Sequence, residues 1–336
     1  MGPHPAVAEV RRAVRVALAQ AFPEPTATSA AVLVACSGGA DSLALAAATA
    51  FEAPRRGLRA GLVTVDHGLQ PGSAERAARA AAIGYQLGLD PVTILAVEVG
   101  AEGGPEAAAR TARYAALDVA AGAHGASVLL GHTLDDQAET VLLGLGRGSG
   151  PRSIAGMRAA DGPYLRPLLN VRRASTLAAC TALGLTPWDD PHNADPTFQR
   201  VRLRLEVLPL LEEVLQGGVA EALARTAALV RDDLDVLDHL AATAATAAAP
   251  PPTSDRDQDA LDAVALAELP RALRRRALQA WSRHHGAGAL SAVHLAALDA
   301  LVVDWHGQGP LDLPGARVAR ASGKLVITPQ PRDPQE

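Results

Sequence analysis

The sequence has few of the residues that mark several common protein classes. Only 3% of its 336 residues are aromatic, so stacking surfaces for bases are scarce. Its two cysteines, Cys36 and Cys180, form neither a CxxC pair nor a metal-binding spacing. This argues against both a zinc site and a disulfide framework.

Positive charge is not in excess either. The formal net charge is −5, and Lys324 is the sole lysine, so arginine carries nearly all of the positive charge. A molecule with this balance does not look like a general nucleic-acid binder. Any contact with RNA would need a local patch of arginines.

Long apolar runs are absent as well. Nowhere do about twenty apolar residues follow one another, as a membrane span requires. The N-terminal segment Val7–Ala21 reads as an amphipathic helix without a signal-peptide core, because Arg11, Arg12 and Arg15 interrupt it. We therefore expect a cytoplasmic protein without a membrane partner, and the length is sufficient for two domains.

The first half alternates apolar, strand-like runs with alanine-rich helical runs. Strands are expected at 31–36, 60–66, 92–98 and 126–131, and helices at 41–52, 73–88, 105–123 and 133–145. This rhythm predicts an α/β fold with a doubly wound, mainly parallel, Rossmann-like sheet. Ligands of such sheets bind beyond the carboxyl ends of the strands.

The second half predicts a different, mostly helical domain. Gly217-Gly218 suggests the boundary, which gives domains at 1–216 and 217–330. The stretch 144–150 is the most flexible piece before that boundary, and the tract 247–259 is expected to be a loop. Helices are expected at 174–183, 201–215, 219–246, 261–285 and 291–304, and a short β pair near 309–320 and 324–328.

The most informative stretch is Ser37-Gly38-Gly39-Ala40-Asp41-Ser42, between the first strand and the first helix of the sheet. A glycine-rich turn that opens a helix presents backbone N–H groups and a positive helix end to phosphate. The two serine hydroxyls are further donors. No Walker-type Lys-Ser/Thr follows, and the acid Asp41 suggests a bridging magnesium ion. An ordinary βα turn with capping serines is the alternative.

Two more polar motifs directly follow strands. They are Asp66-His67-Gly68 and Gly131-His132, and a doubly wound sheet would bring both to the edge that carries Ser37–Ser42. A helix-capping Asp and a turn His explain Asp66 and His67 as well. On the helix after the fourth strand, His132, Asp136 and Glu139 fall on one face. The two carboxylates repel each other, and an amine substrate or a second magnesium ion would compensate their charge. A solvated polar helix start is the alternative.

The pattern of residues 37–42 resembles the signature of the ATP pyrophosphatases, which split ATP between its α- and β-phosphates. The whole set of motifs, in this order, resembles the tRNA(Ile)-lysidine synthase family. These motifs are SGGADS at 37–42, VDHGL at 65–69, ARTARYAAL at 109–117, GHTLDDQAET at 131–140, RGSG at 147–150, RPLL at 166–169, Trp188–Asn193, Arg200–Arg204 and, more weakly, LDLPGARVAR at 311–320.

The resemblance implies a ligase that adenylates the wobble cytidine of a CAU-anticodon isoleucine tRNA. L-lysine then displaces AMP to give lysidine, with ATP and Mg²⁺ required and pyrophosphate released. Nucleotide binding is expected at Ser37, Gly38, Gly39, Ala40, Asp41, Ser42, Asp66, His67 and Gly131, with magnesium at Asp41. Catalysis is expected from Asp136, Glu139, His132 and Arg113, with lysine bound by Asp136 and Glu139.

Contact with tRNA is expected at arginines. The candidates are Arg147, Arg200, Arg204, Arg274 and Arg275, the last two in the densest basic cluster of the second domain. A solvated helix face explains such a cluster as well, and also explains Arg113. In the family the second position of the 200–204 motif is often Asn, whereas this chain has Val201. That difference puts a contact by this side chain in doubt.

Other functions stay open at this point. Another ATP pyrophosphatase, such as a tRNA thiolase or an amide- or adenylate-forming synthetase, shares the phosphate loop. However, the chain lacks paired cysteines for thiolation and lacks a glutaminase segment. A non-catalytic nucleotide-binding regulator would have no use for the acids of the 131–140 motif. The sequence leaves the oligomeric state open, with a homodimer as one option.

Overall fold

A computed structural model describes residues 2–23, 30–68, 72–100, 104–148, 150–190, 195–249 and 260–330. The chain divides into two compact units, residues 1–229 and 230–336. Parts of the sequence motifs lie outside the described residues, namely Leu69, Ser149, Pro191–Asn193 and residues 250–259 of the expected loop.

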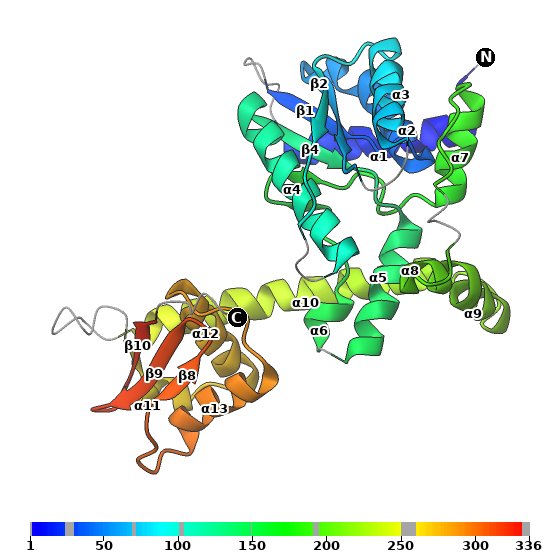
Figure 1. The fold of residues 1–336 in the computed structure, drawn as a ribbon. Coiled ribbons are helices and arrows are strands. Elements are labelled where there is room, and N and C mark those ends of the chain that lie inside the picture. The colour runs from blue at the N-terminus through cyan, green and yellow to red at the C-terminus, as the bar shows by residue number, and fades with distance from the viewer. Residues whose placement is uncertain are drawn as a thin grey trace. The chain divides into compact units, whose positions relative to one another are not determined.

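The first unit is built on a six-stranded sheet with the order β3-β2-β1-β4-β6-β5. Three of these strands, β1, β2 and β4, are labelled in Figure 1. All neighbouring strands are parallel except β5 and β6. In the centre, Val34 of β1 pairs with Leu62 of β2 and Leu129 of β4. The strands are β1 (Ala31–Ala35), β2 (Arg59–Asp66), β3 (Val92–Ala96), β4 (Ala126–Leu130), β5 (Ala160–Asp161) and β6 (Tyr164–Leu165). The predicted mainly parallel sheet is confirmed.

Successive residues of β1 enter two different cores, as a strand with two buried faces requires. Val32 and Val34 belong to the core under α1, α2 and α7, whereas Ala31 and Leu33 belong to the core under α4. The helices of the sheet are α1 (Pro5–Ala21), α2 (Ala40–Glu52), α3 (Ser73–Gln86), α4 (Pro105–His124) and α7 (Arg173–Ala182), with a short helix η1 (Pro54–Arg56) after α2. The sheet is thus doubly wound, as expected.

Helix α5 (Leu134–Arg147) follows β4 and runs through most of the stretch that the sequence suggested was flexible. A Cβ atom on Gly144 would lie 1.9 Å from the carbonyl oxygen of Ser153, which belongs to helix α6 (Pro151–Ile154). The missing side chain therefore allows close packing here, and the expectation of a flexible 144–150 segment was wrong for 144–147.

The predicted helix at 201–215 is present as three consecutive helical segments. They are α8 (Gln199–Arg202), the π-helical segment η3 (Leu203–Val207) and α9 (Leu208–Val214). Helix α10 (Val219–Ala247) follows, and the division between the two units falls within it, at 229/230. The domain boundary predicted after residue 216 stays a prediction. No described helix combines the length and apolar character that crossing a bilayer requires.

The second unit contains a sheet that the sequence only partly predicted. Its order is β7-β10-β9-β8, and all pairs are antiparallel. The expected helix 261–285 is wrong at its start, because Pro270 precedes a new helix and cannot continue an old one. The elements are β7 (Leu261–Asp262), α11 (Ala263–Ala267), α12 (Arg271–His284), α13 (Ala292–Val303), β8 (Leu311–Leu313), β9 (Ala316–Ala321) and β10 (Lys324–Pro329).

Candidate active site

The three polar motifs predicted at strand ends line one cavity of about 970 Å³ in the first unit. Its wall includes Asp41 of the glycine-rich loop, His67 after β2 and His132 after β4. These residues are far apart in sequence and meet because the carboxyl ends of β1, β2 and β4 share one edge. Also in the wall are the predicted residues Ser37, Gly39, Ala40, Ser42, Asp66, Gly131, Asp136, Arg113 and Arg204.

The loop between β1 and α2 has the shape of an anion site. Gly39 is the N-cap of α2 and has no side chain to satisfy the N–H groups of the first turn, so these remain available to an anion. The Ser42 hydroxyl accepts from the Ser37 N–H at 3.2 Å and donates to the Gly39 carbonyl at 2.9 Å. Ser42 therefore stabilises the loop, whereas the sequence suggested a donor to phosphate.

Gly131 allows the end of β4 to approach this loop closely. A Cβ atom there would lie 3.1 Å from the carbonyl carbon of Asp41 and from the amide nitrogen of Ser42. These contacts are tighter than most real Cβ contacts, and backbone atoms cannot give way easily. A side chain at residue 131 would push apart the two segments that build the cavity.

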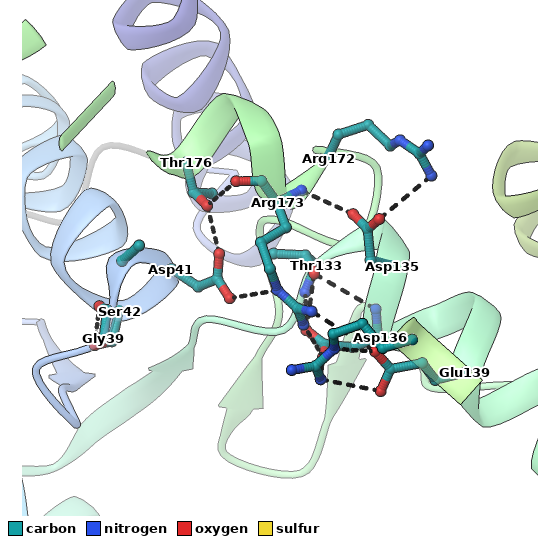
Figure 2. A network of polar contacts seen from close by, with 12 residues as sticks. Gly39, Asp41, Ser42, Thr133, Asp135, Asp136, Glu139, Arg172, Arg173 and Thr176 are labelled. Carbon is teal, nitrogen blue, oxygen red and sulfur yellow. Dashed lines mark hydrogen bonds and ion pairs between the residues drawn. The ribbon is translucent and has the colours of Figure 1, made fainter. Parts of the chain in front are cut away.

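Arg173, the first residue of α7, lies among the acids of the site (Figure 2). Its Nη2 donates to Asp136 Oδ1 at 2.6 Å, its Nε donates to Asp41 Oδ2 at 3.3 Å, and its backbone N–H donates to Asp135 Oδ2 at 2.8 Å. One arginine thus bridges the acid of the phosphate loop and the acids of α5. The sequence suggested an amine or a metal ion as their compensating charge and missed this residue.

Hydrogen bonds fix the carboxylates of Asp136 and Asp41. Thr133 donates to Asp136 Oδ2 from its backbone N–H and its hydroxyl, each at 2.8 Å, and Thr176 donates to Asp41 Oδ1. Burial acts to raise the pKa of Asp136, but Arg173 and Thr133 lower it overall. Burial raises the pKa of Asp41 despite Thr176 and Arg173. Asp136 is therefore the more firmly ionised of the two.

Glu139 is not part of the cavity wall. Its side chain is 0% exposed and is bound in two contacts by Arg204, with Nε at 2.8 Å and Nη2 at 3.2 Å. Arg173 and Arg200 approach the same carboxylate at 3.7 Å and 3.9 Å. The sequence placed Glu139 beside Asp136 as a lysine ligand, whereas in this geometry its partners are arginines.

Four nitrogen-bearing side chains of the cavity have buried atoms without a hydrogen-bond partner among the described residues. These atoms are Nδ1 of His67, Nδ1 of His132, Nε of Arg113 and Nε1 of Trp188. Burial lowers the pKa of His132 to about 4, and it also lowers the pKa of His67 and of Arg113. His132 is therefore neutral at pH 7 and can act as a hydrogen-bond donor or acceptor without a charge.

Asp66 has a local role in addition to lining the cavity. Its Oδ1 accepts from the Gly68 N–H at 3.0 Å, and hydrogen bonds from Ser73 and Gly68 lower the pKa of its carboxyl group. The contact with Gly68 stabilises the turn after β2, whereas the N-cap of α3 is Gly72 and not Asp66.

The predicted tRNA-binding arginines lie in different environments. Arg147 ends α5 and is exposed, and Arg200 is partly exposed with Nη1 3.5 Å from the Thr140 hydroxyl. In the second unit, Arg274 is buried and donates to Asp299 and to the carbonyl of Leu269. Arg275 donates to the same carboxylate at 2.9 Å. Arg274 is thus an interior residue, contrary to the expectation of a surface contact.

Comparison with known proteins places these features in a family. Residues 10–211 match the PP-loop domain, and residues 261–326 match the TilS substrate binding domain. The tRNA(Ile)-lysidine synthase of Thermobifida fusca is 56% identical over 331 residues, which cover 97% of this chain and 99% of that protein. The chain belongs to the tRNA(Ile)-lysidine synthase family.

Further relatives agree with this assignment. The tRNA(Ile)-lysidine synthase of Leifsonia xyli is 56% identical over 310 residues, covering 92% of this chain and 93% of that protein. Among solved structures, the U34-tRNA thiolase NcsA from Methanococcus maripaludis superposes with a TM-score of 0.56 at 18% identity, covering 67% of this chain and 80% of that one. That likeness shows only that the two proteins share a fold.

A metal ion would find few protein ligands. No group of three His, Cys, Asp or Glu side chains suited to a metal ion occurs in the part of the chain that the structure describes. Asp41, the predicted magnesium ligand, is held by Thr176 and Arg173. A magnesium ion here would take most of its oxygen ligands from phosphate and water, which is its usual preference at nucleotide sites.

Proposed function

We propose that this chain is an ATP-using ligase that joins L-lysine to the wobble cytidine of an isoleucine tRNA with a CAU anticodon. AMP and pyrophosphate are released. The observation that carries the proposal is that a phosphate loop and a firmly ionised Asp136 line the same cavity. Membership of the tRNA(Ile)-lysidine synthase family supports the same reaction. Another ATP pyrophosphatase is not favoured.

The loop at 37–42 binds the pyrophosphate part of ATP. The start of α2 supports this role, because Gly39 leaves the N–H groups of the first turn available to phosphate. Mg²⁺ bound near Asp41 would offset the phosphate charge. Asp66 and His67 border the nucleotide, and Gly131 keeps the end of β4 against the loop.

Formation of the adenylated base places negative charge on the α-phosphate. Arg113 lies in the cavity wall, where its buried Nε has no hydrogen-bond partner among the described residues, and it supplies a positive charge there. Neutral His132 orients the phosphate or the base by hydrogen bonding. The carbonyl oxygen at C2 of the cytidine attacks the α-phosphorus, and pyrophosphate leaves with the bonding electrons.

The ε-amine of lysine then attacks C2 of the activated base, and AMP leaves. An ammonium group cannot attack, so a base must first accept a proton. Asp136 binds the ammonium and assists this transfer, sharing its carboxylate with Arg173. Glu139 contributes through the arginines it holds, because its own side chain is fully buried.

The test is mass spectrometry of the target tRNA after incubation with ATP, Mg²⁺ and L-lysine. We expect the addition of one lysine, and pyrophosphate release that depends on both tRNA and lysine. Asp136→Asn should lower the rate about 100-fold or more, because it removes the negative charge that binds the amine and assists its loss of a proton. Equal pyrophosphate release without tRNA or without lysine would contradict the proposal.

Arg172→Gln is the matched control. Arg172 is the neighbour of Arg173 and pairs with Asp135, Glu212 and Glu221, and it does not line the cavity. Its loss should leave lysine transfer within a few-fold of the unmodified protein. A loss as large as that of Asp136→Asn would mean that the two positions affect folding and not chemistry.

A further inference from the structure

The phosphate loop carries no cation of its own. Residues 37–42 include one acid, Asp41, and neither lysine nor arginine. A polyphosphate chain is strongly negative and needs compensating positive charge beyond backbone N–H groups. Four arginines line the cavity, namely Arg76, Arg113, Arg173 and Arg204. Arg173 and Arg204 pair with Asp136 and Glu139.

Arg76 lies on the face of α3 that packs against the loop. A Cβ atom built on Gly38 would lie 4.0 Å from Cβ of Ala80, which places α3 directly beside the loop. Arg76 precedes Ala80 by one helical turn and shares its face. Ala77, between them, is also part of the cavity wall. Arg76 is therefore near the segment expected to bind the β- and γ-phosphates.

Trp188 connects Arg76 to the loop. Its backbone N–H donates to the Gly38 carbonyl at 2.8 Å, and its Cβ lies 3.8 Å from the Cβ position on Gly38. The guanidinium carbon of Arg76 lies 5.6 Å from the centre of the Trp188 ring, within the range of a cation–π contact. The backbone and Cβ of Trp188 thus lie against the loop, and its indole ring lies near the arginine.

Carboxylates in the same cavity increase the need for such a cation. Asp66 lies close enough to Arg76 for the arginine to help lower its pKa, after the larger effects of Ser73 and Gly68. Asp189 and Asp190 follow Trp188 in the chain and also line the cavity. Without Arg76, a polyphosphate would meet these acids with less charge to offset the repulsion.

We propose that Arg76, held on the ring of Trp188, binds the polyphosphate chain of ATP and supplies the positive charge that the loop lacks. This inference rests on the proposed function, because it assumes that the loop binds a nucleotide. It assigns a binding role to Arg76 of α3 and to Trp188 of the segment after α7. It predicts that the arginine acts on phosphate and not on the adenine or the ribose.

The test is calorimetric titration of the full chain with inorganic pyrophosphate, with MgATP and with adenosine, in the absence of lysine and tRNA. Arg76→Gln should weaken binding of pyrophosphate and of MgATP roughly tenfold, the effect of losing one charge-assisted hydrogen bond. Arg76→Lys should retain part of that affinity. Affinity for adenosine should be the same in all variants.

Arg79→Gln is the control, because Arg79 lies at 5.9 Å from the same ring but is exposed and does not line the cavity. It should bind pyrophosphate like the unmodified protein. Equal weakening by Arg79→Gln and Arg76→Gln would indicate a general charge effect and overturn the assignment. Unchanged binding by Arg76→Gln would also overturn it, and the proposed ligase activity would stand.

Two variants of Trp188 test its part. Trp188→Phe keeps an aromatic face, and the indole nitrogen has no hydrogen-bond partner among the described residues, so this variant should bind pyrophosphate nearly normally. Trp188→Leu removes the face and should approach Arg76→Gln in affinity, and combining it with Arg76→Gln should add little. Full affinity in Trp188→Leu, with circular dichroism showing a folded protein, would overturn the role of the ring. If the unmodified protein bound neither pyrophosphate nor MgATP, the proposed function itself would fail.

Discussion

Single side chains in the cavity act through partners that lie far away in sequence. Arg173 follows Asp41 by 132 residues, yet it bridges that acid and Asp136. The sequence predicted the acids, because they directly follow strands whose ends must meet. It did not predict Arg173, since an arginine at a helix start has many possible partners. Trp188 was part of a recognised motif, but nothing in the sequence indicated its contact with Gly38.

The neutral state of His132 gives a pH-dependent stability. Its pKa is about 4 in the folded protein, mainly because of burial, against about 6.5 when unfolded. Between these values the unfolded chain binds more protons, so the free energy of unfolding falls as the pH falls. From pH 7 to pH 5 we expect His132→Gln to lose roughly 2 kcal/mol less than the unmodified protein. Urea unfolding at both pH values measures this, and equal losses in the two proteins would contradict it.

Among the secondary-structure elements, the strands and helices of the sheet were predictable and the short ones were not. The strand expected at 60–66 is found at Arg59–Asp66, because long apolar runs bounded by turns leave little choice. The two-residue strands β5, β6 and β7 carry no periodicity that a sequence could show. They form because neighbouring strands are already in place to pair with them.

The packing of α6 on α5 gives a prediction with an internal control. Gly144→Ala should destabilise the protein by about 1–3 kcal/mol, because the new methyl group would meet the backbone of Ser153. Gly146→Ala lies in the same helix with nothing within 4 Å of its Cβ position, so it should stabilise by up to about 1 kcal/mol. Thermal unfolding of the two variants checks this. Destabilisation of equal size would show that helix α5 and not the contact with Ser153 is affected.

Across the whole chain, the sequence predicted two parts, and the boundary that it placed after residue 216 stays a prediction. Gly217-Gly218 is the most conspicuous break in composition, whereas the contacts divide the chain at 229/230 within a continuous helix. Compactness depends on contacts between distant residues, which local composition does not report. For the same reason the sequence predicted only part of the antiparallel sheet of the second unit. Its first strand in the chain, β7, pairs with its last, β10.

The separate cores of the two units predict that their stabilities can be changed independently. Asp299 is buried and accepts from Arg274 at 2.6 Å and from Arg275 at 2.9 Å. Asp299→Asn should destabilise the second unit by about 3 kcal/mol, because it leaves buried guanidinium charge without its counterion. Calorimetry should show a lower unfolding temperature for that unit, and pyrophosphate affinity should be unchanged. A parallel loss of pyrophosphate affinity would mean that the two cores unfold together.

Part of the cavity wall is formed by residues that come later in the chain than the last strand of the sheet. Arg173, Trp188 and Arg204 all follow β6, which ends at Leu165. During synthesis, a nascent chain of which only the sheet has left the ribosome therefore has a phosphate loop with one side of its cavity missing. Such a nascent chain should not consume ATP, and a product truncated before Arg173 should be inert rather than a wasteful hydrolase.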